Sequence, residues 1–333
     1  MPLLSILMPV YDAAATLRAA LRSVSAQSFR DWELIAVDDG SRDASLAILE
    51  RAAAKDARLR VVPRPHAGHV EALRSAAALA SGPLLARMDA DDLMHPLRLQ
   101  LQAERFDAAP RVDLLATRVR SIGDTAEGMR RYVDWQNGLE SHDDLVANLF
   151  VESPIAHPTV MMRSDAFERA GGYRDPGWAE DYDLWHRMRE EGARFEKLPR
   201  ALLSWRDGAG RLTRRHPMYA ESKFYAAKLH YFKRHPLCKS PVTVWGAGPI
   251  GRSWVRDLLA AGLSVPRVID IDPKKIGRTI ADGRAKVVSP DEGLKRREGL
   301  VLGAVGSRGA RDLIRQRLLK ESLAEGRDFL FVA

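Results

Sequence analysis

The first 90 residues alternate between two hydrophobic periods, and this alternation restricts the fold more than any other feature. Short apolar runs, typical of buried strands, alternate with segments whose apolar residues recur three and four positions apart, which indicates amphipathic helices. The expected strands cover residues 3–8, 33–37, 59–62 and 84–88, and the expected helices cover 16–28, 45–54 and 70–80. Repeated strand–helix–strand units predict an α/β fold with a parallel sheet covered by helices.

The length of 333 residues favours two domains, and the apolar content of 46% allows a large core. Residues 235–241 contain two prolines and interrupt the pattern. A new strand is expected at 242–245, followed by a helix to about residue 261 and a strand at 268–271. We therefore expect a domain at 1–235, with a basic helical tail at 215–235, and a smaller α/β domain at 241–333.

The net charge of +8 suggests polyanionic partners. Residues 211–240 carry eight Lys or Arg against one acid, Glu221, interleaved with aromatic residues. This stretch either touches anionic lipid, bringing the protein to a lipid-linked acceptor, or packs on the protein body with a solvated basic face, which we favour. Nucleic-acid binding is not expected, since no recognised module is present.

The location expected from the sequence is cytoplasmic, with peripheral contact at the inner face of the membrane under the lipid alternative. The single cysteine, Cys238, excludes an internal disulfide and suits a reducing compartment. No apolar run approaches the roughly 18 residues that span a bilayer, and the first residues lack the basic region of a signal peptide. The state of oligomerisation is left open.

Ligands of such sheets bind at the carboxyl ends of the strands, and three polar loops lie there. In the loop Asp89-Ala90-Asp91-Asp92, alternate carboxylates can reach one Mn²⁺ or Mg²⁺ ion that neutralises a leaving diphosphate. The alternative is that Asp91 or Asp92 caps a helix beginning near Pro96. Arg87 either pairs with phosphate or is a structural partner of these acids.

Two further acidic segments also have alternative explanations. Asp38-Asp39 either forms a turn or offers a carboxylate to the imide N–H of a base. Glu180-Asp181 opens an expected helix, where acids favour the dipole, but a carboxylate there could also deprotonate an acceptor hydroxyl. His157 is either a packed residue or a catalyst, and both remain open.

Together these loops resemble the family 2 glycosyltransferases of the GT-A fold over residues 3–215. The matching segments are Ser5-Ile6-Leu7-Met8-Pro9-Val10-Tyr11, Val37-Asp38-Asp39-Gly40-Ser41, residues 68–82, Ala86-Arg87-Met88-Asp89-Ala90-Asp91-Asp92, His157-Pro158-Thr159-Val160-Met161, and Gly171-Gly172-Tyr173 leading to Ala179-Glu180-Asp181-Tyr182-Asp183-Leu184-Trp185. The resemblance implies an inverting, metal-dependent transfer of a sugar, from a UDP-sugar above all, to a hydroxyl of a glycan or lipid-linked acceptor.

The resemblance also implies a role for each matching residue. The residues that would bind the donor are Pro9, Tyr11, Asp12, Asp39, Arg74, Arg87, Asp89, Arg206 and Arg211. Asp91 would be the metal ligand with Asp89 in support, Asp181 the general base, and His157 and Glu180 would lie on the acceptor side. Asp92 then remains as the helix cap.

This sequence departs from the family pattern at several of these positions. Asp12 stands where the family usually has Asn or Glu. The basic residue of the third helix that usually contacts the donor is displaced to Arg74. The usual His of a later motif is missing, and Arg206 or Arg211 would clamp the diphosphate instead. The Gln-x-x-Arg-Trp signature of processive synthases is absent, which indicates transfer of one sugar at a time.

The C-terminal part carries a dinucleotide-binding fingerprint. Gly246, Gly248 and Gly251 form G-x-G-x-x-G between an expected strand and helix, and Asp270 and Asp272 follow the next strand. The segment resembles small Rossmann-like domains attached to sugar-modifying enzymes. NAD(P) or another nucleotide could bind there, and the alternative is a structural or regulatory domain with a degenerate site. An NAD(P)-dependent sugar-nucleotide-modifying enzyme and a noncatalytic sugar-nucleotide sensor are therefore the competing functions.

Overall fold

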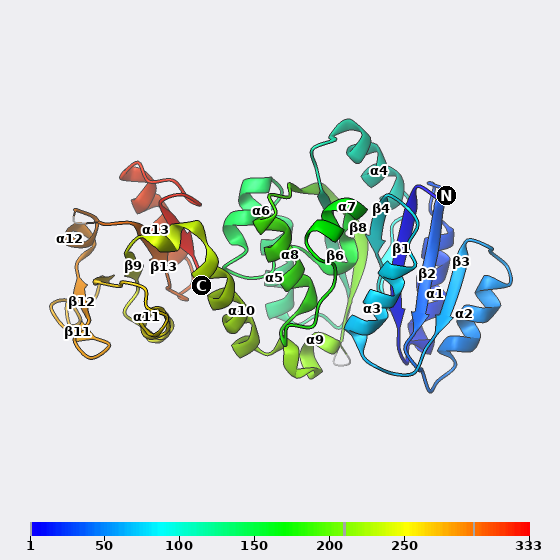
Figure 1. Cartoon of the computed structure of the whole chain (residues 1–333), viewed down its shortest axis with the longest axis horizontal. Coiled ribbons are helices and arrows are strands. Elements are labelled where there is room, and N and C mark those ends of the chain that lie inside the picture. Colours follow the sequence, from blue (N-terminus) through cyan, green and yellow to red (C-terminus); the bar gives the residue numbers. More distant parts are fainter. Residues whose placement is uncertain (1, 209–210, 296) are drawn as a thin grey trace. The chain divides into compact units, whose positions relative to one another are not determined.

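The chain divides into two compact units in the computed structural model, which describes residues 2–208, 211–295 and 297–333 (Figure 1). The first unit contains the chain up to Leu145 together with Pro154–Ala220. The second unit contains Val146–Ser153 and Glu221–Ala333. The short segment Val146–Ser153 therefore belongs to the second unit, although it interrupts the sequence of the first.

An eight-stranded mixed sheet forms the centre of the first unit. Its strands are β1 (Leu4–Val10), β2 (Trp32–Asp38), β3 (Leu59–Pro63), β4 (Leu84–Arg87), β5 (Leu93–Met94), β6 (Leu114–Gly123), β7 (Met161–Arg163) and β8 (Phe195–Asp207). The order is β3-β2-β1-β4-β7-β6-β8-β5. The first four neighbours are parallel, and β7 pairs antiparallel with both β4 and β6. The parallel half confirms the strands expected from the first 90 residues.

Helices cover this sheet on both faces. They are α1 (Ala14–Ser25), α2 (Ser45–Ala53), α3 (His69–Ala78), α4 (Arg98–Ala108), α5 (Glu127–Asn137), α7 (Ser164–Arg169), α8 (Glu180–Glu190) and α9 (Leu212–Arg215), with 3-10 turns η1 (His157–Thr159) and η2 (Pro217–Tyr219). The helix α6 (His142–Asn148) runs from the residues of the first unit into those of the second.

The alternation of β1 explains how the parallel strands are covered. All seven residues of β1 are buried, and Leu4, Ile6 and Met8 join a core that also contains residues of α1, α2 and α4. Because successive side chains of a strand point to opposite faces, Leu7 points to the other face, where α3 contacts β1 and β2. Burial on both faces explains why this strand is a continuous apolar run.

The region between residues 110 and 205, in which the sequence predicts no strand, contains most of the mixed half of the sheet, where β7 is antiparallel to its neighbours and β6 and β8 are parallel. The strand β8 is 13 residues long and pairs with β6 through a register shift near Arg118. Its far end also pairs with β5, at Leu93–Ser204 and Met94–Leu203. This pairing brings Arg206 to the loop that follows β4.

The second unit has its own six-stranded sheet. The strands are β9 (Val242–Trp245), β10 (Arg267–Ile269), β11 (Thr279–Ile280), β12 (Ala285–Val288), β13 (Leu300–Gly303) and β14 (Phe329–Phe331), in the order β11-β12-β10-β9-β13-β14. All neighbours are parallel except β11 and β12. The helices are α10 (Glu221–Arg234), α11 (Pro249–Ala260), α12 (Pro290–Lys295) and α13 (Ala310–Lys320), with the 3-10 turn η3 (Pro236–Lys239).

The basic helix α10 groups with the second unit, whereas it was expected as a tail of the first domain. The reason is its aromatic face, since Tyr231 and Phe232 are buried in the second core beside Phe150 and Trp254. Its exposed side chains include Lys223, Lys233 and Arg234.

This packing agrees with the alternative of a helix on the protein body with a solvated basic face. The side chains of Arg215 and Lys239, which belong to the same basic stretch, lie outside the described residues. Among the described residues, every helix is too short or too polar to cross a bilayer.

Candidate active site

Three carboxylates gather in the loop after β4, as the resemblance implied for two of them. Asp89, Asp91 and Asp92 each offer an oxygen, and these oxygens lie within 4.8 Å of one another. The Oδ2 atom of Asp92 is buried without a hydrogen-bond donor among the described residues. A set of hard oxygen ligands with one buried, unpaired oxygen fits a divalent cation such as Mg²⁺ or Mn²⁺.

Arg87 holds the first of these carboxylates. Its guanidinium, 1% exposed, donates from Nη2 to Oδ1 of Asp89 at 2.6 Å. Burial opposes ionisation of Asp89, but the charge and hydrogen bond of Arg87, together with His69 and His157, outweigh burial and lower the pKa of Asp89. This contact is the structural role that the sequence left as the alternative to phosphate binding.

The other two carboxylates are in a different electrostatic state. Burial and the charge of Asp89 raise the pKa of Asp91 to about 6. Burial and the charges of Asp89 and Asp91 raise the pKa of Asp92 well above its usual range. A bound cation would reverse these shifts, because it stabilises all three ionised carboxylates at once.

Asp92 is not a helix cap, which corrects the expectation from the sequence. The strand β5 follows this loop, and α4 begins only at Arg98, after Leu97, without a side-chain cap. Asp92 instead accepts a hydrogen bond at 2.7 Å from the backbone N–H of Arg206. The carboxylate thus joins the loop after β4 to the end of β8.

Two arginines, Arg206 near the end of β8 and Arg211 just after it, face the acidic loop. The Nε of Arg206 donates to the backbone carbonyl of Asp91 at 2.8 Å. The guanidinium of Arg211 stacks over Trp205 at 4.2 Å and lies 3.8 Å from the buried Asp207. The charges of Arg211 and Arg206 both act to lower the pKa of Asp91, so both guanidinium groups influence the acidic loop electrostatically.

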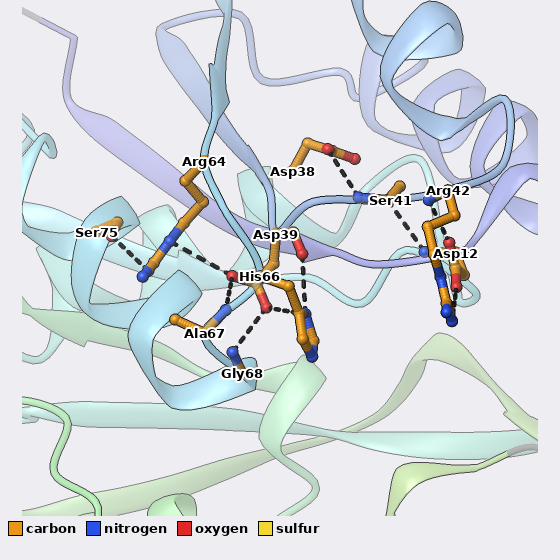
Figure 2. Close-up of polar contacts among 10 residues, drawn as sticks. All are labelled: Asp12, Asp38, Asp39, Ser41, Arg42, Arg64, His66, Ala67, Gly68 and Ser75. Carbon is orange, nitrogen blue, oxygen red and sulfur yellow. Dashed lines mark hydrogen bonds and ion pairs between the residues drawn. The ribbon is translucent and has the colours of Figure 1, made fainter.

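The turn after β2 is organised by Asp39, which is 2% exposed (Figure 2). Its two oxygens accept hydrogen bonds from the backbone N–H groups of Ala67, at 3.1 Å, and Gly68, at 2.8 Å. Nδ1 of His66 lies 2.8 Å from Oδ2, and Nε of Arg64 lies 3.4 Å from Oδ1. Asp39 therefore fixes the loop that leads into α3, and its predicted contact with a base stays a prediction.

Tyr11 forms an exposed aromatic surface beside this turn. Its ring is 39% exposed and stacks on His66 at 4.2 Å. Asp12 adopts a positive φ of 45° and accepts hydrogen bonds from the backbone and the guanidinium of Arg42 (Figure 2). A flat face at the carboxyl end of a strand suits stacking of a nucleobase.

Two other predicted donor residues lie in different settings. Pro9 is buried within β1, opposite Val37 of β2. Arg74 lies on the exposed side of α3 and pairs with Glu71 at 2.6 Å. It is Arg64 that approaches Asp39, and it also donates to Ser75.

Glu180 and Asp181 at the start of α8 lie close enough to Arg87 for their charges to interact. Burial and the charge of Glu180 raise the pKa of Asp181 well above its usual range, while Arg87 opposes this. His157 is buried and its Nδ1 lies 3.5 Å from Oε1 of Glu180. Sequence reasoning missed His69 and Tyr219, which also contact Glu180; the only local signal was the position of His69 at the start of an expected helix.

The glycine fingerprint of the second unit lies between β9 and α11. A Cβ on Gly251 would meet the carbonyl oxygen of Gly246 at 1.7 Å, whereas a Cβ on Gly248 would meet nothing within 4 Å. Asp270 accepts hydrogen bonds from the backbone N–H groups of Ala247, at 2.8 Å, and Asp272, at 2.9 Å. The loop is therefore tight at its base and open at its tip.

The comparison with protein families now identifies the class. Residues 5–171 match the model of glycosyl transferase family 2. The chain belongs to this family and is a glycosyltransferase.

Relatives agree with this assignment. EpsE of Bacillus subtilis is 29% identical over 226 residues, which cover 66% of this chain and 78% of EpsE. The O-antigen biosynthesis glycosyltransferase WbnJ of Escherichia coli is 27% identical over 207 residues, which cover 61% of this chain and 79% of WbnJ. For y4gI of Sinorhizobium fredii, 31% identical over 262 residues, the match spans only 28% of that longer protein.

Solved structures share the fold. TarS of S. aureus in complex with UDP-GlcNAc has a TM-score of 0.57 at 18% identity, covering 70% of this chain and 67% of that one. The mannosyltransferase PcManGT of Pyrobaculum calidifontis, in complex with GDP-Man and Mn²⁺, has a TM-score of 0.54 at 19% identity, covering 70% and 65%. These likenesses support the GT-A fold expected for the first unit.

Proposed function

We propose that the chain transfers one sugar at a time from a nucleotide diphosphate sugar, a UDP-sugar above all, to a hydroxyl acceptor, with inversion and with a divalent metal. The observation that carries this proposal is the cluster of Asp89, Asp91 and Asp92 facing Arg206 and Arg211. Carboxylates for a cation and guanidinium groups for phosphate are the two requirements for binding a sugar diphosphate. GDP-Man and Mn²⁺ in PcManGT and UDP-GlcNAc in TarS support this donor class.

In this proposal the residues divide the work of the displacement. Asp91 and Asp89 hold the metal, which supplies charge stabilisation to the departing diphosphate. Arg206 and Arg211 bind the diphosphate oxygens, while Tyr11 stacks on the base.

Asp181 takes the proton of the acceptor hydroxyl in the same proposal. A carboxyl with a raised pKa suits a general base near neutral pH, because its affinity for the proton is then higher than that of an ordinary carboxylate.

The names of two relatives support the proposed acceptor class. WbnJ is named for O-antigen biosynthesis, and AmsE of Erwinia amylovora for amylovoran biosynthesis. We propose a glycan or lipid-linked acceptor in the assembly of a cell-surface polysaccharide, with the protein acting in the cytoplasm.

The test measures release of nucleoside diphosphate from UDP-GlcNAc, UDP-Glc, UDP-Gal and GDP-Man with Mn²⁺, with water and with glycolipid extract as acceptors. We expect Asp91→Ala to lower turnover by about 100-fold or more. Asp181→Asn should keep donor binding and lose transfer. Asp31→Ala is the matched control, because Asp31 is exposed at the opposite end of β2. A wild-type protein that binds none of the four donors would contradict the proposal, and binding without turnover would favour a sensor.

A second proposal concerns a nucleotide site in the second unit. The parallel strands follow the order β12-β10-β9-β13-β14, which is the Rossmann arrangement 3-2-1-4-5. The open space at Gly248 would let a diphosphate approach the backbone, and the crowded Gly251 would allow α11 to pack closely on the loop. We propose a Rossmann-like domain at 241–333 that binds a nucleotide, with NAD(P) as the first candidate. Titration with NAD(H) and NADP(H) tests it, and the oxidoreductase alternative falls if neither cofactor binds.

A further inference from the structure

The carboxylate of Glu180 lies at the meeting point of four segments of the first unit. It is 2% exposed. Nε2 of His69, the first residue of α3, lies 3.3 Å from Oε1, and Nδ1 of His157 in η1 lies 3.5 Å from the same atom. The hydroxyl of Tyr219 in η2 donates to Oε2 at 2.7 Å. Both oxygens of Glu180 are thus used inside the protein.

A neutral His157 and an ionised Glu180 give each contact of this network one donor and one acceptor. Burial and the charge of Arg87 lower the pKa of His157 to about 4, so this imidazole is neutral and has one N–H. Its Nε2 lies 2.9 Å from the hydroxyl of Tyr173 and accepts from it, which leaves the Nδ1–H for Glu180. Burial opposes ionisation of Glu180, but the hydrogen bonds from His157 and His69 outweigh it and hold its pKa well below the usual range.

These contacts separate Glu180 from its neighbour Asp181 in chemical role. An ionised carboxylate that is 2% exposed and contacts three side chains inside the protein is poorly placed to receive the proton of an acceptor hydroxyl. Asp181 is the next residue of α8, about 100° further round the helix axis. The described hydrogen bond to its carboxylate comes from the adjacent backbone N–H of Tyr182, at 2.7 Å. Fixing Glu180 inward therefore fixes the direction in which Asp181 points.

We propose that Glu180 is a positioning residue whose contacts with His69, His157 and Tyr219 hold the first turn of α8 so that Asp181 faces the acceptor. The proposal rests on the proposed function, in which Asp181 is the base. Tyr219 follows the segment that carries Arg211, so the same carboxylate also ties the diphosphate side of the site to the base helix.

The test compares Tyr219→Phe, Glu180→Gln and Glu180→Ala with Asp181→Asn. The donor is the sugar nucleotide from the panel above that turns over fastest, and the acceptor is water. Tyr225→Phe is the matched control, because its hydroxyl also donates to a carboxylate, Asp257, at 2.7 Å but in the second unit. Hydrogen exchange of the first turn of α8 is measured alongside and needs no turnover.

We expect Tyr219→Phe and Glu180→Gln to lower kcat by about tenfold with KM for the donor changed by less than about twofold, because only the positioning of the base is lost. Glu180→Gln should retain more activity than Glu180→Ala, since the amide keeps one acceptor oxygen. Exchange in the first turn of α8 should be faster in Tyr219→Phe and unchanged in the control.

Other outcomes would overturn the proposal. If Glu180→Gln loses as much activity as Asp181→Asn while Tyr219→Phe is unchanged, Glu180 is the base. If the losses appear only in KM, or if exchange in α8 is unchanged, the network does not position Asp181. Absence of donor binding by the wild type refutes the proposed function instead, and the exchange result then judges the network alone.

Discussion

Single residues of the acidic loop differ in what they need from a ligand. Asp89 pairs with Arg87, which favours its ionised form, whereas among the described residues no salt bridge reaches the carboxylates of Asp91 and Asp92, which lie beside like charges. Burial and repulsion between the carboxylates raise their pKa values, and a cation that binds there would relieve this repulsion. Asp39 is the opposite case, because its carboxylate accepts hydrogen bonds from the backbone N–H groups of Ala67 and Gly68.

Lys197 in β8 leads to a prediction about pH and stability. Burial lowers its pKa to about 7, and its ammonium donates to the carbonyl oxygens of Gln136 and Pro154. The unfolded chain keeps this proton up to about pH 10.5, so unfolding takes up a proton between pH 7 and 10.5 and the stability of the wild type rises with pH there. In Lys197→Met this rise should be smaller by an amount on the order of 3 kcal/mol.

Urea unfolding at pH 7 and pH 10 measures this difference. The control is Lys55→Met, because Lys55 is exposed in the same unit. A difference between wild type and Lys197→Met that is constant across this pH range would show that the lysine is not buried as described.

Elements differ in how well local sequence predicts them. The strands β1 to β4 and β9 were predicted because their periodicity is contained within each segment, and a few residues at the ends were all that differed. The strand β8 was not, since it is stabilised by β6 and β5, which are distant in sequence. The error about Asp92 has the same origin, because its partner Arg206 comes from β8.

The same limit applies to the candidate site. The carboxylates after β4 were identified because a motif lies within four consecutive residues. The network around Glu180 was not, because His69, His157 and Tyr219 meet it only in the folded chain. No single segment of the sequence shows that these side chains converge.

The loop between β9 and α11 gives a prediction at this scale. Gly251→Ala should destabilise the second unit by about 3 kcal/mol, because the new methyl group would overlap the carbonyl oxygen of Gly246. Gly248→Ala should leave stability within about 1 kcal/mol of the wild type, because the space around it is open and its φ is −82°. It should nevertheless abolish NAD(P) binding if a diphosphate lies against this backbone.

Thermal unfolding and cofactor titration of the two variants distinguish these effects. Equal destabilisation by both substitutions would contradict the description of the loop. Unchanged cofactor affinity in Gly248→Ala would show that the diphosphate does not bind against Gly248.

The molecule as a whole consists of two units that are not separated at one point of the sequence. The second unit takes Val146–Ser153 from the middle of the chain, and Phe150 of this segment packs against Phe232 with ring centroids 5.8 Å apart. A fragment that ends near residue 235 therefore contains Phe150 and α10 but lacks most of the core residues that bury them.

Truncation after residue 240 should consequently harm the remaining chain. We expect this fragment to bind the dye ANS and to unfold at a lower temperature than the full chain, because the apolar faces of Phe150, Tyr231 and Phe232 are left exposed. Substitution of Phe150 by Ala in the full chain should cost about 3–5 kcal/mol in the second unit. A fragment that does not bind ANS and unfolds at the same temperature as the full chain would show that other parts of the fragment bury Phe150 and α10.

The segment Val146–Ser153 is also synthesised long before the rest of the unit in which it packs. Phe150 leaves the ribosome well before β14, which completes the sheet of the second unit and lies far later in the sequence. At roughly 5–20 residues per second, an apolar segment waits on the order of ten seconds or more for its partners. During this time the apolar segment around Phe150 is exposed in every partly synthesised chain and prone to aggregation. The rate of translation therefore affects the yield of active enzyme.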